Sequence, residues 1–378
     1  MSRYTVAGRV TGARMWKWIV GGIVAVVAVL LGIVFYVYDE PDIPRAVLEA
    51  KYASPPSKFI VLADGTRVHY RDRGPRNAPV LLLLHGSNSS LFDWEEWSKI
   101  LSQPSEAPIP TTFGVRLGVV TTNRPLSEKE KAAALNSFQR LLAELRGQFR
   151  VISIDLPGHG LTGAVANGDY SEAGMTEFVK AFADKLGLTQ FAIAGNSMGG
   201  GVAARFAELY PDRVTHLILI DAHAWGMSAT GDRIPFAFKL AGVPVLGNLL
   251  LYVTPRSLVE EGLEDAIMRR KILTDTMIDR YWDFARMEGT RQATLSRFRL
   301  PQDTYVRDHI SRIKAPTLIL WGNDDRLLPV AGARAWAKAI PGSKLIVYPA
   351  TGHLPMEEVP RKSADDVRAF IRAQSGKV

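Results

Sequence analysis

One segment limits the possible folds more than any other. In FAIAGNSMGGGVAARFAELYP, a buried-strand pattern at Phe191–Ala194 runs into a glycine-flanked serine, Ser197, and then into a helix pattern. The segment satisfies G-x-S-x-G, with strand and helix where that motif requires them. Such a turn strains the serine backbone and lifts Oγ above the sheet edge, and side chains at the glycine positions would collide with neighbouring elements. The pattern predicts an α/β fold with Ser197 as a nucleophile at a helix N-terminus, where N–H groups favour negative charge.

Strand-like and helix-like segments alternate beyond residue 57. This alternation predicts a mainly parallel, doubly wound sheet with helices on both faces, preceded by a hairpin at Asp64-Gly65. A helix is expected at 91–101. The expected strands are 59–62, 68–71, 80–84, 151–156, 191–194, 216–220, 317–321 and 345–348.

Two stretches interrupt the alternation. Residues 102–147 exceed an ordinary connection; they begin as a loop and end in a predicted helix, which starts at a capping box of Ser127 and Glu130 and runs to about Arg146. Residues 223–305 are rich in helix patterns, and we expect them to form a helical cap over the site. Their aromatic residues include Trp225, Phe236, Phe238, Tyr252, Tyr281, Trp282 and Phe284.

The N-terminal region contains an uncharged apolar run, Trp18–Tyr38. Its 21 residues, at about 1.5 Å each, match a hydrocarbon core of about 30 Å. A cleaved signal peptide is the alternative, but its apolar region would be about 7–15 residues long and would end at small residues. Here FYVYDEPD ends the run, and aromatic residues flank it as at a membrane interface. The sequence therefore predicts one uncleaved transmembrane helix.

Charge predicts the orientation of that helix. The positive-inside rule places residues 1–17 in the cytoplasm and everything after residue 38 across the membrane, which is the periplasm if the protein is bacterial. Residues 39–57 form a proline-punctuated linker with a short helix expected at Arg45–Tyr52, and residues 58–378 form the catalytic domain. The deciding charges are Arg3, Arg9, Arg14 and Lys17 before the run, and Asp39, Glu40 and Asp42 after it.

Composition excludes several classes of protein. The 378-residue chain has no cysteine, so disulfides, thiolate metal sites and cysteine nucleophiles are excluded. Its net charge of +8 is spread along the chain among acidic residues, and no nucleic-acid-binding motif accompanies it. We therefore expect no nucleic-acid partner, and the predicted chemistry requires neither a metal nor an organic cofactor.

A second motif, Leu84-His85-Gly86-Ser87-Asn88, ends the strand at 80–84. In this architecture that loop supplies one N–H of an oxyanion hole, and the residue after the nucleophile supplies the other. These N–H groups are assigned to Ser87 and Met198. His85 is interpreted as bracing the loop rather than as a base.

The remaining catalytic groups follow the last two predicted strands. His353, in TGHLP, is the expected base that takes the Ser197 proton. Asp325, in WGNDDR, is the expected acid that orients the imidazole, because the order serine, acid, histidine is that of this architecture. Asp324 is an alternative acid, and Asp221 is a more distant one.

These motifs together resemble the α/β-hydrolase superfamily over residues 58–372: HGS, DLPGHG at 155–160, GNSMGG and the late TGH stand in register. GNSMGG resembles the meta-cleavage-product hydrolases, which split C–C bonds with the same triad. Two features depart from that family, SNSS after Gly86 and Leu354 after His353. Its cap arginine is not placed by any motif, and Arg256 is one candidate. The serine differs from the aspartate of the related dehalogenases and epoxide hydrolases.

The expectation for function is a membrane-anchored serine hydrolase. It would cleave a carboxylic ester of a small or medium hydrophobic substrate through an acyl-enzyme, and it would contact the lipid bilayer through residues 18–38. C–C bond hydrolysis, acyl transfer, and an inactive binding or scaffold role are the alternatives.

Overall fold

The computed structural model describes residues 15–26, 29, 32, 40–105, 127–223, 243, 246–300 and 305–375. Residues 15–26 are helical, and much of the predicted membrane segment at 18–38 lies outside the described residues. Within the described ranges, no helix is both long and apolar enough to span a bilayer, so the transmembrane helix has no support there.

The centre of the fold is an eight-stranded sheet in the order β1-β2-β4-β3-β5-β6-β7-β8. The first two strands form the predicted hairpin and pair antiparallel, as do β2 and β4, whereas every other neighbouring pair is parallel. This confirms the mainly parallel sheet. The strands are β1 (Ser57–Val61), β2 (Arg67–Arg73), β3 (Val80–Leu84), β4 (Arg150–Ile154), β5 (Phe191–Asn196), β6 (Val214–Ile220), β7 (Thr317–Gly322) and β8 (Lys344–Tyr348).

Helices cover both faces of this sheet because the parallel strands are apolar on both sides. In β3, Leu82 and Leu84 pack into one core with α5, α6 and α12, while Leu81 and Leu83 pack into a second core with α3 and α14. The doubly wound prediction is thereby confirmed. These helices are α3 (Glu95–Leu101), α5 (Glu172–Lys185), α6 (Met198–Leu209), α12 (Ala331–Ala339) and α14 (Pro360–Ser375).

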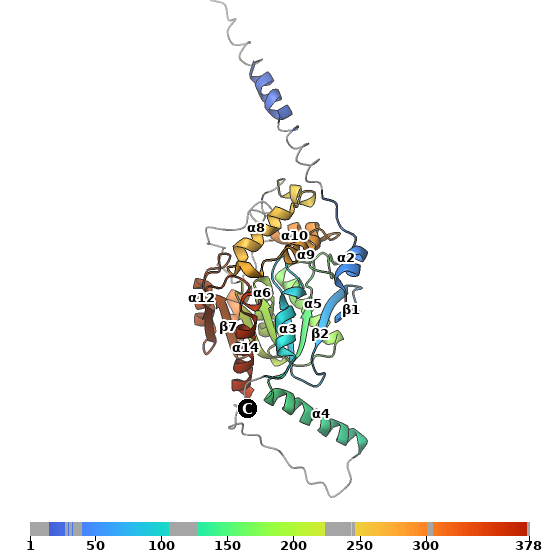
Figure 1. The fold of residues 1–378 in the computed structure, drawn as a ribbon, viewed down its shortest axis with the longest axis vertical. Helices are drawn as coiled ribbons and strands as arrows, with labels where there is room; N and C mark the ends of the chain where they lie inside the picture. The colour runs from blue at the N-terminus through green and yellow to red at the C-terminus, as the bar shows by residue number, and fades with distance from the viewer. Residues whose placement is uncertain are drawn as a thin grey trace, which may run out of the picture.

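The described part of the predicted cap is helical, as expected, and lies above one end of the sheet (Figure 1). Trp225, Phe236 and Phe238 lie outside the described residues. The side chain of Thr274 caps α9 by accepting a hydrogen bond from the N–H of Met277 at 3.2 Å. The cap comprises η3 (Leu246–Leu251), α8 (Arg256–Ala266), η4 (Arg270–Ile272), α9 (Asp275–Ala285) and α10 (Thr290–Phe298).

The helix predicted in the 102–147 insertion is α4 (Glu128–Leu145), at the opposite end of the molecule (Figure 1). Its capping box forms as predicted: the N–H of Ser127 donates to Glu130 at 2.8 Å, and the N–H of Glu130 donates to Ser127 Oγ at 3.3 Å. Residues 106–126 of the insertion lie outside the described residues.

Three details differ from the sequence prediction or complete it. The helix expected at 91–101 begins with a 3₁₀ turn, η1 (Leu91–Trp94), before α3. The strand expected at 151–156 ends at Ile154, and the next residue, Asp155, binds neighbouring loops through its carboxylate. The short connecting elements are η2 (Pro211–Arg213), α11 (Tyr305–His309), η5 (Ile310–Arg312) and α13 (Pro355–Glu358).

The predicted linker is attached to the cap over its described length. The N–H of Glu40 donates to the carbonyl of Tyr252 at 3.2 Å, and Arg286 pairs with the Glu40 carboxylate at 2.7 Å. The helix expected at 45–52 is present as α2 (Arg45–Tyr52), and its Leu48 packs into a small apolar core with Phe284 of α9. Residues 40–53 therefore form part of the cap's packing.

Candidate active site

Ser197 occupies the strained turn between β5 and α6. Its backbone has φ +51° and ψ −120°, in a region that side-chain-bearing residues rarely adopt. A Cβ on Gly195 would lie 2.0 Å from the carbonyl oxygen of Gly199, and a Cβ on Gly199 would lie 2.4 Å from that of Leu84. These collisions explain why the motif requires glycine on both sides of the serine.

Asp325 and His353 form a buried pair beyond the carboxyl ends of β7 and β8. His353 Nδ1 lies 2.7 Å from Asp325 Oδ2, and Asp325 Oδ1 accepts the N–H groups of Leu327 at 2.8 Å and Leu328 at 2.9 Å. Asp325 is 6% exposed. Of the two adjacent aspartates, the structure thus places Asp325 on the histidine, while Asp324 makes no contact with that ring among the described hydrogen bonds.

The predicted nucleophile and base open into one cavity, because Ser197 and His353 both line it. Within the described residues, Ser197 Oγ and the His353 ring make no hydrogen bond with each other, which is common before substrate binds. Asn196 joins the two segments: its Nδ2 donates to the carbonyl oxygens of His353 at 3.0 Å and Ile220 at 3.1 Å. This role of Asn196 could not be assigned from the sequence, although the residue lies inside the G-x-S-x-G motif.

The loop after β3 lies against the serine turn. A Cβ on Gly86 would lie 3.2 Å from the Cβ of Ser197. His85 Nε2 accepts the N–H of Leu156 at 3.0 Å, which confirms that it braces the loop. The N–H groups of Ser87 and Met198 donate to no other group in the described part of the chain, so both can donate to a ligand.

Arg297 of α10 reaches this loop from the cap. Its guanidinium donates to Ser87 Oγ and, at 3.4 Å, to Asn88 Oδ1. Asn88 has φ +56°, so Arg297 holds a loop that includes a strained residue. Burial lowers the pKa of Arg297 to about 10, and no carboxylate lies among its described partners. Its charge also lowers the pKa of His159 and His223, after the larger effect of their burial.

A second contact ties the cap to the same loop. The Tyr281 hydroxyl of α9 donates to Asp93 Oδ1 at 2.8 Å, and the Ser89 hydroxyl donates to the other carboxylate oxygen. Burial raises the pKa of Asp93, and these two hydrogen bonds oppose that rise. Neither Arg297 nor Tyr281 could be assigned from sequence, because each lies about 190 residues or more from its partner.

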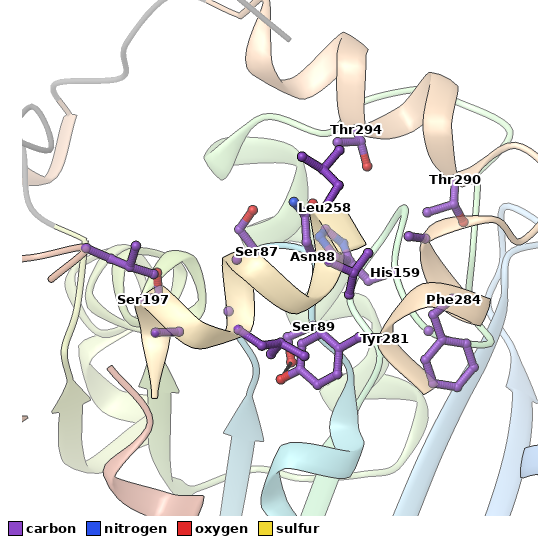
Figure 2. Close-up of a pocket in the computed structure, with 18 of the residues that line it drawn as sticks. Ser87, Asn88, Ser89, His159, Ser197, Leu258, Tyr281, Phe284, Thr290 and Thr294 are labelled. Atoms are coloured by element: carbon purple, nitrogen blue, oxygen red, sulfur yellow. Dashed lines mark hydrogen bonds between the residues drawn. The ribbon is translucent and has the colours of Figure 1, made fainter. Parts of the chain in front are cut away.

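The cavity between the cap and the sheet has a volume of about 200 Å³. Figure 2 shows Ser87, Asn88 and Ser89 lying between Ser197 on one side and Phe284 and Thr290 on the other. Most of the surface of the wall is apolar. Its apolar side chains are Leu258, Val259, Leu263, Ala266, Phe284, Ala285, Leu295, Phe298, Leu327 and Leu354.

Arg256 lies outside this cavity. Its guanidinium contacts the carboxylates of Asp279 at 2.7 Å, Asp275 at 2.6 Å and Glu260 at 3.3 Å. The hypothesis that Arg256 is a cap arginine facing substrate is therefore wrong, because it is bound by acidic residues of α8 and α9 away from the site.

Known proteins show the same fold and similar sequences. The sequence model described as alpha/beta hydrolase fold matches residues 132–360. A 2-hydroxy-6-oxononadienedioate/2-hydroxy-6-oxononatrienedioate hydrolase of Comamonas testosteroni is 28% identical over 222 residues, which are 58% of this chain and 75% of the relative. Monoacylglycerol lipase abhd6-A of Xenopus laevis is 29% identical over 228 residues, which are 58% of this chain and 67% of the relative.

Among solved structures, a membrane phospholipase A, described as a novel bacterial virulence factor, superposes with a TM-score of 0.61. It is 22% identical, and the match covers 94% of this chain and 98% of that one, a likeness that shows the fold alone. The chain belongs to the α/β-hydrolase fold family. It is a hydrolase of that family, whose relatives include hydrolases of meta-cleavage products and lipases.

Proposed function

We propose that the protein is a membrane-anchored serine hydrolase that cleaves a carboxylic ester of a small or medium hydrophobic substrate. The observation that carries this proposal is the convergence of Ser197, in its strained turn, and the Asp325–His353 pair on one mainly apolar cavity. An apolar wall suits an acyl chain. The cavity volume of about 200 Å³ is smaller than the ~300–1,000 Å³ of most ligand pockets, which favours a small or medium substrate.

In the proposed mechanism, the Ser197 hydroxyl attacks the ester carbonyl while His353 takes its proton. Asp325 holds the imidazole and stabilises the imidazolium that forms. The N–H groups of Ser87 and Met198 donate to the developing oxyanion. His353 then gives the proton to the leaving alcohol, and water releases the acid from Ser197 by the same steps.

Labelling with a fluorophosphonate probe tests the nucleophile. We expect Ser197 to be labelled and Ser197→Ala to be neither labelled nor active on p-nitrophenyl acyl esters, with Ser137→Ala, at an exposed serine of α4, as a labelled control. Absence of labelling in the folded wild-type protein would favour the alternative of a binding or scaffold protein. A panel of esters of increasing chain length then defines the acyl group.

C–C bond hydrolysis is the second candidate. The relative named as a 2-hydroxy-6-oxononadienedioate/2-hydroxy-6-oxononatrienedioate hydrolase supports it. Competition between p-nitrophenyl esters and a dienol diketone separates the two candidates. Faster turnover of the diketone would contradict ester hydrolysis as the main activity and favour C–C bond hydrolysis. Transfer of the acyl group to an added alcohol would indicate an acyltransferase.

We further propose that residues 18–38 anchor the protein in a bilayer, with the N-terminus cytoplasmic and the catalytic domain outside. Only two residue steps separate Tyr38 from Glu40, a reach of about 7 Å. Because Glu40 is bound to the cap, the anchor would hold the cap close to the lipid surface and so near lipid-soluble esters. Retention in the membrane pellet after alkaline extraction, lost on deletion of residues 18–38, tests the anchor.

A further inference from the structure

Asp221 lies at the centre of the site, yet it has no role in the mechanism above. It follows β6, between the ends of the strands that carry Ser197 and Asp325. It is fully buried, and its backbone has φ +41°. Strain of this kind in a side-chain-bearing residue persists only where the surrounding structure enforces it.

The carboxyl group of Asp221 faces a second carboxyl group. Asp221, Asp325 and His353 each have a ligating atom within 4.8 Å of the others. Asp221 Oδ1 accepts the N–H of Gly322 at 2.9 Å, and Oδ2 has no donor among the described residues. Repulsion between two buried carboxylates this close favours protonation of one of them.

The hydrogen bonds decide which carboxyl group holds that proton. Asp325 accepts three donors, namely two backbone N–H groups and the His353 ring, and each favours the ionised form. Among the described residues, Asp221 accepts only one donor, the N–H of Gly322. Burial, and after it the negative charge of Asp325, raise the pKa of Asp221 well above its ordinary value.

We propose that Asp221 is a neutral carboxylic acid that donates its proton to Asp325 and thereby positions this carboxylate on His353. Asp221 is a positioning residue, since it acts through Asp325 and does not touch the substrate. The inference rests on the catalytic roles proposed for Asp325 and His353. The titratable groups around Asp221 are Asp325, His353, Glu358 and Tyr348.

Infrared difference spectroscopy of the full-length protein tests the proton directly. At about pH 8, ordinary carboxyl groups are ionised. We expect the difference between the wild-type and Asp221→Asn spectra to contain the carbonyl stretch of a protonated carboxylic acid, and the difference between the wild-type and Asp324→Asn spectra to lack it. Absence of this band from the first difference spectrum would overturn the proposal. The band does not depend on turnover, so this result is separate from failure of Ser197 labelling.

Kinetics test the positioning role. Asn donates a hydrogen bond as a protonated Asp does, so Asp221→Asn should keep kcat within about threefold, whereas Asp221→Leu should lower kcat about tenfold with little change in KM. If Asp221 were an anion, its removal would destabilise the imidazolium and move the acidic limb of kcat/KM to lower pH. We expect no such move in Asp221→Asn. A move of that kind, or loss of activity on treatment with a chelator, would contradict the proposal; the second would indicate a metal held by the three residues.

Discussion

The chain holds two buried aspartate–histidine pairs of nearly equal geometry. His69 Nδ1 lies 2.6 Å from Asp155 Oδ2, and His353 Nδ1 lies 2.7 Å from Asp325 Oδ2. Each carboxylate also accepts two backbone N–H groups: those of Leu91 and Leu161 on Asp155, and those of Leu327 and Leu328 on Asp325. The distance to the histidine and the number of backbone donors therefore do not distinguish the two pairs.

The two pairs differ in the surroundings of the histidine ring on the side away from the aspartate. His353 lines the cavity that Ser197 also lines, whereas His69 is 0% exposed and its Nε2 has no partner among the described residues. The Asp155–His69 pair joins β2 to the loop after β4. A hydrogen-bonded pair therefore becomes available for catalysis only when its second ring nitrogen can reach a substrate, and otherwise the same pair supports the fold.

Replacing the acid of the cavity-facing pair should have the largest effect. Asp325→Asn should lower kcat by about 10³–10⁴-fold, because the imidazole loses the carboxylate that fixes its tautomer. Steady-state kinetics on a p-nitrophenyl ester measures the loss, and Asp324→Asn is the matched control, expected to remain active. Equal losses in both variants would remove the distinction between the two aspartates.

Replacing the acid of the sealed pair should act on stability instead. Asp155→Asn should lower the free energy of unfolding by about 3–5 kcal/mol at pH 7, because buried His69 then lacks the carboxylate that it pairs with. Chemical denaturation measures this effect, with the exposed Asp212→Asn as control. The kcat of the remaining folded protein should change by less than about threefold. Lost activity at unchanged stability would mean that this pair is also catalytic.

The stability effect should depend on pH. Burial alone would raise the pKa of Asp155, but the charge and hydrogen bond of His69 lower it overall. A carboxyl group whose pKa is lowered in the folded protein stabilises it above the unfolded pKa, about 3.9, and this contribution is lost as the pH falls through the folded pKa. The difference between wild type and Asp155→Asn should therefore shrink below about pH 4.

The smallest expected effect comes from breaking the contact between Arg297 of the cap and the loop of Ser87 and Asn88. Arg297→Gln should lower kcat/KM about tenfold, because the loop of Ser87 loses a charged hydrogen-bond donor. Arg299→Gln, at the exposed residue that follows α10, should leave it unchanged. An unchanged rate in Arg297→Gln would mean that the loop keeps its position without the cap.

By itself, the sequence determined the sheet, its helical layers, the elbow at Ser197 and the bracing role of His85. These features depend on local patterns: apolar runs for buried strands, glycines where a Cβ would collide, and chain order for the predicted acid and base. The sequence left Asp324 as an alternative to Asp325 for the catalytic acid. It also did not predict the contacts of Arg297, Tyr281 and Asn196.

Only the tertiary structure decided which side chains meet across large sequence separations. It bound Arg256 to acidic residues outside the cavity, brought Asp221 against Asp325, and sealed His69 while leaving His353 at the cavity. The physical reason is that burial and partner geometry, rather than residue type, set the protonation and accessibility of each group. The same kind of aspartate–histidine pair can therefore stabilise the fold at one position and be available for catalysis at another.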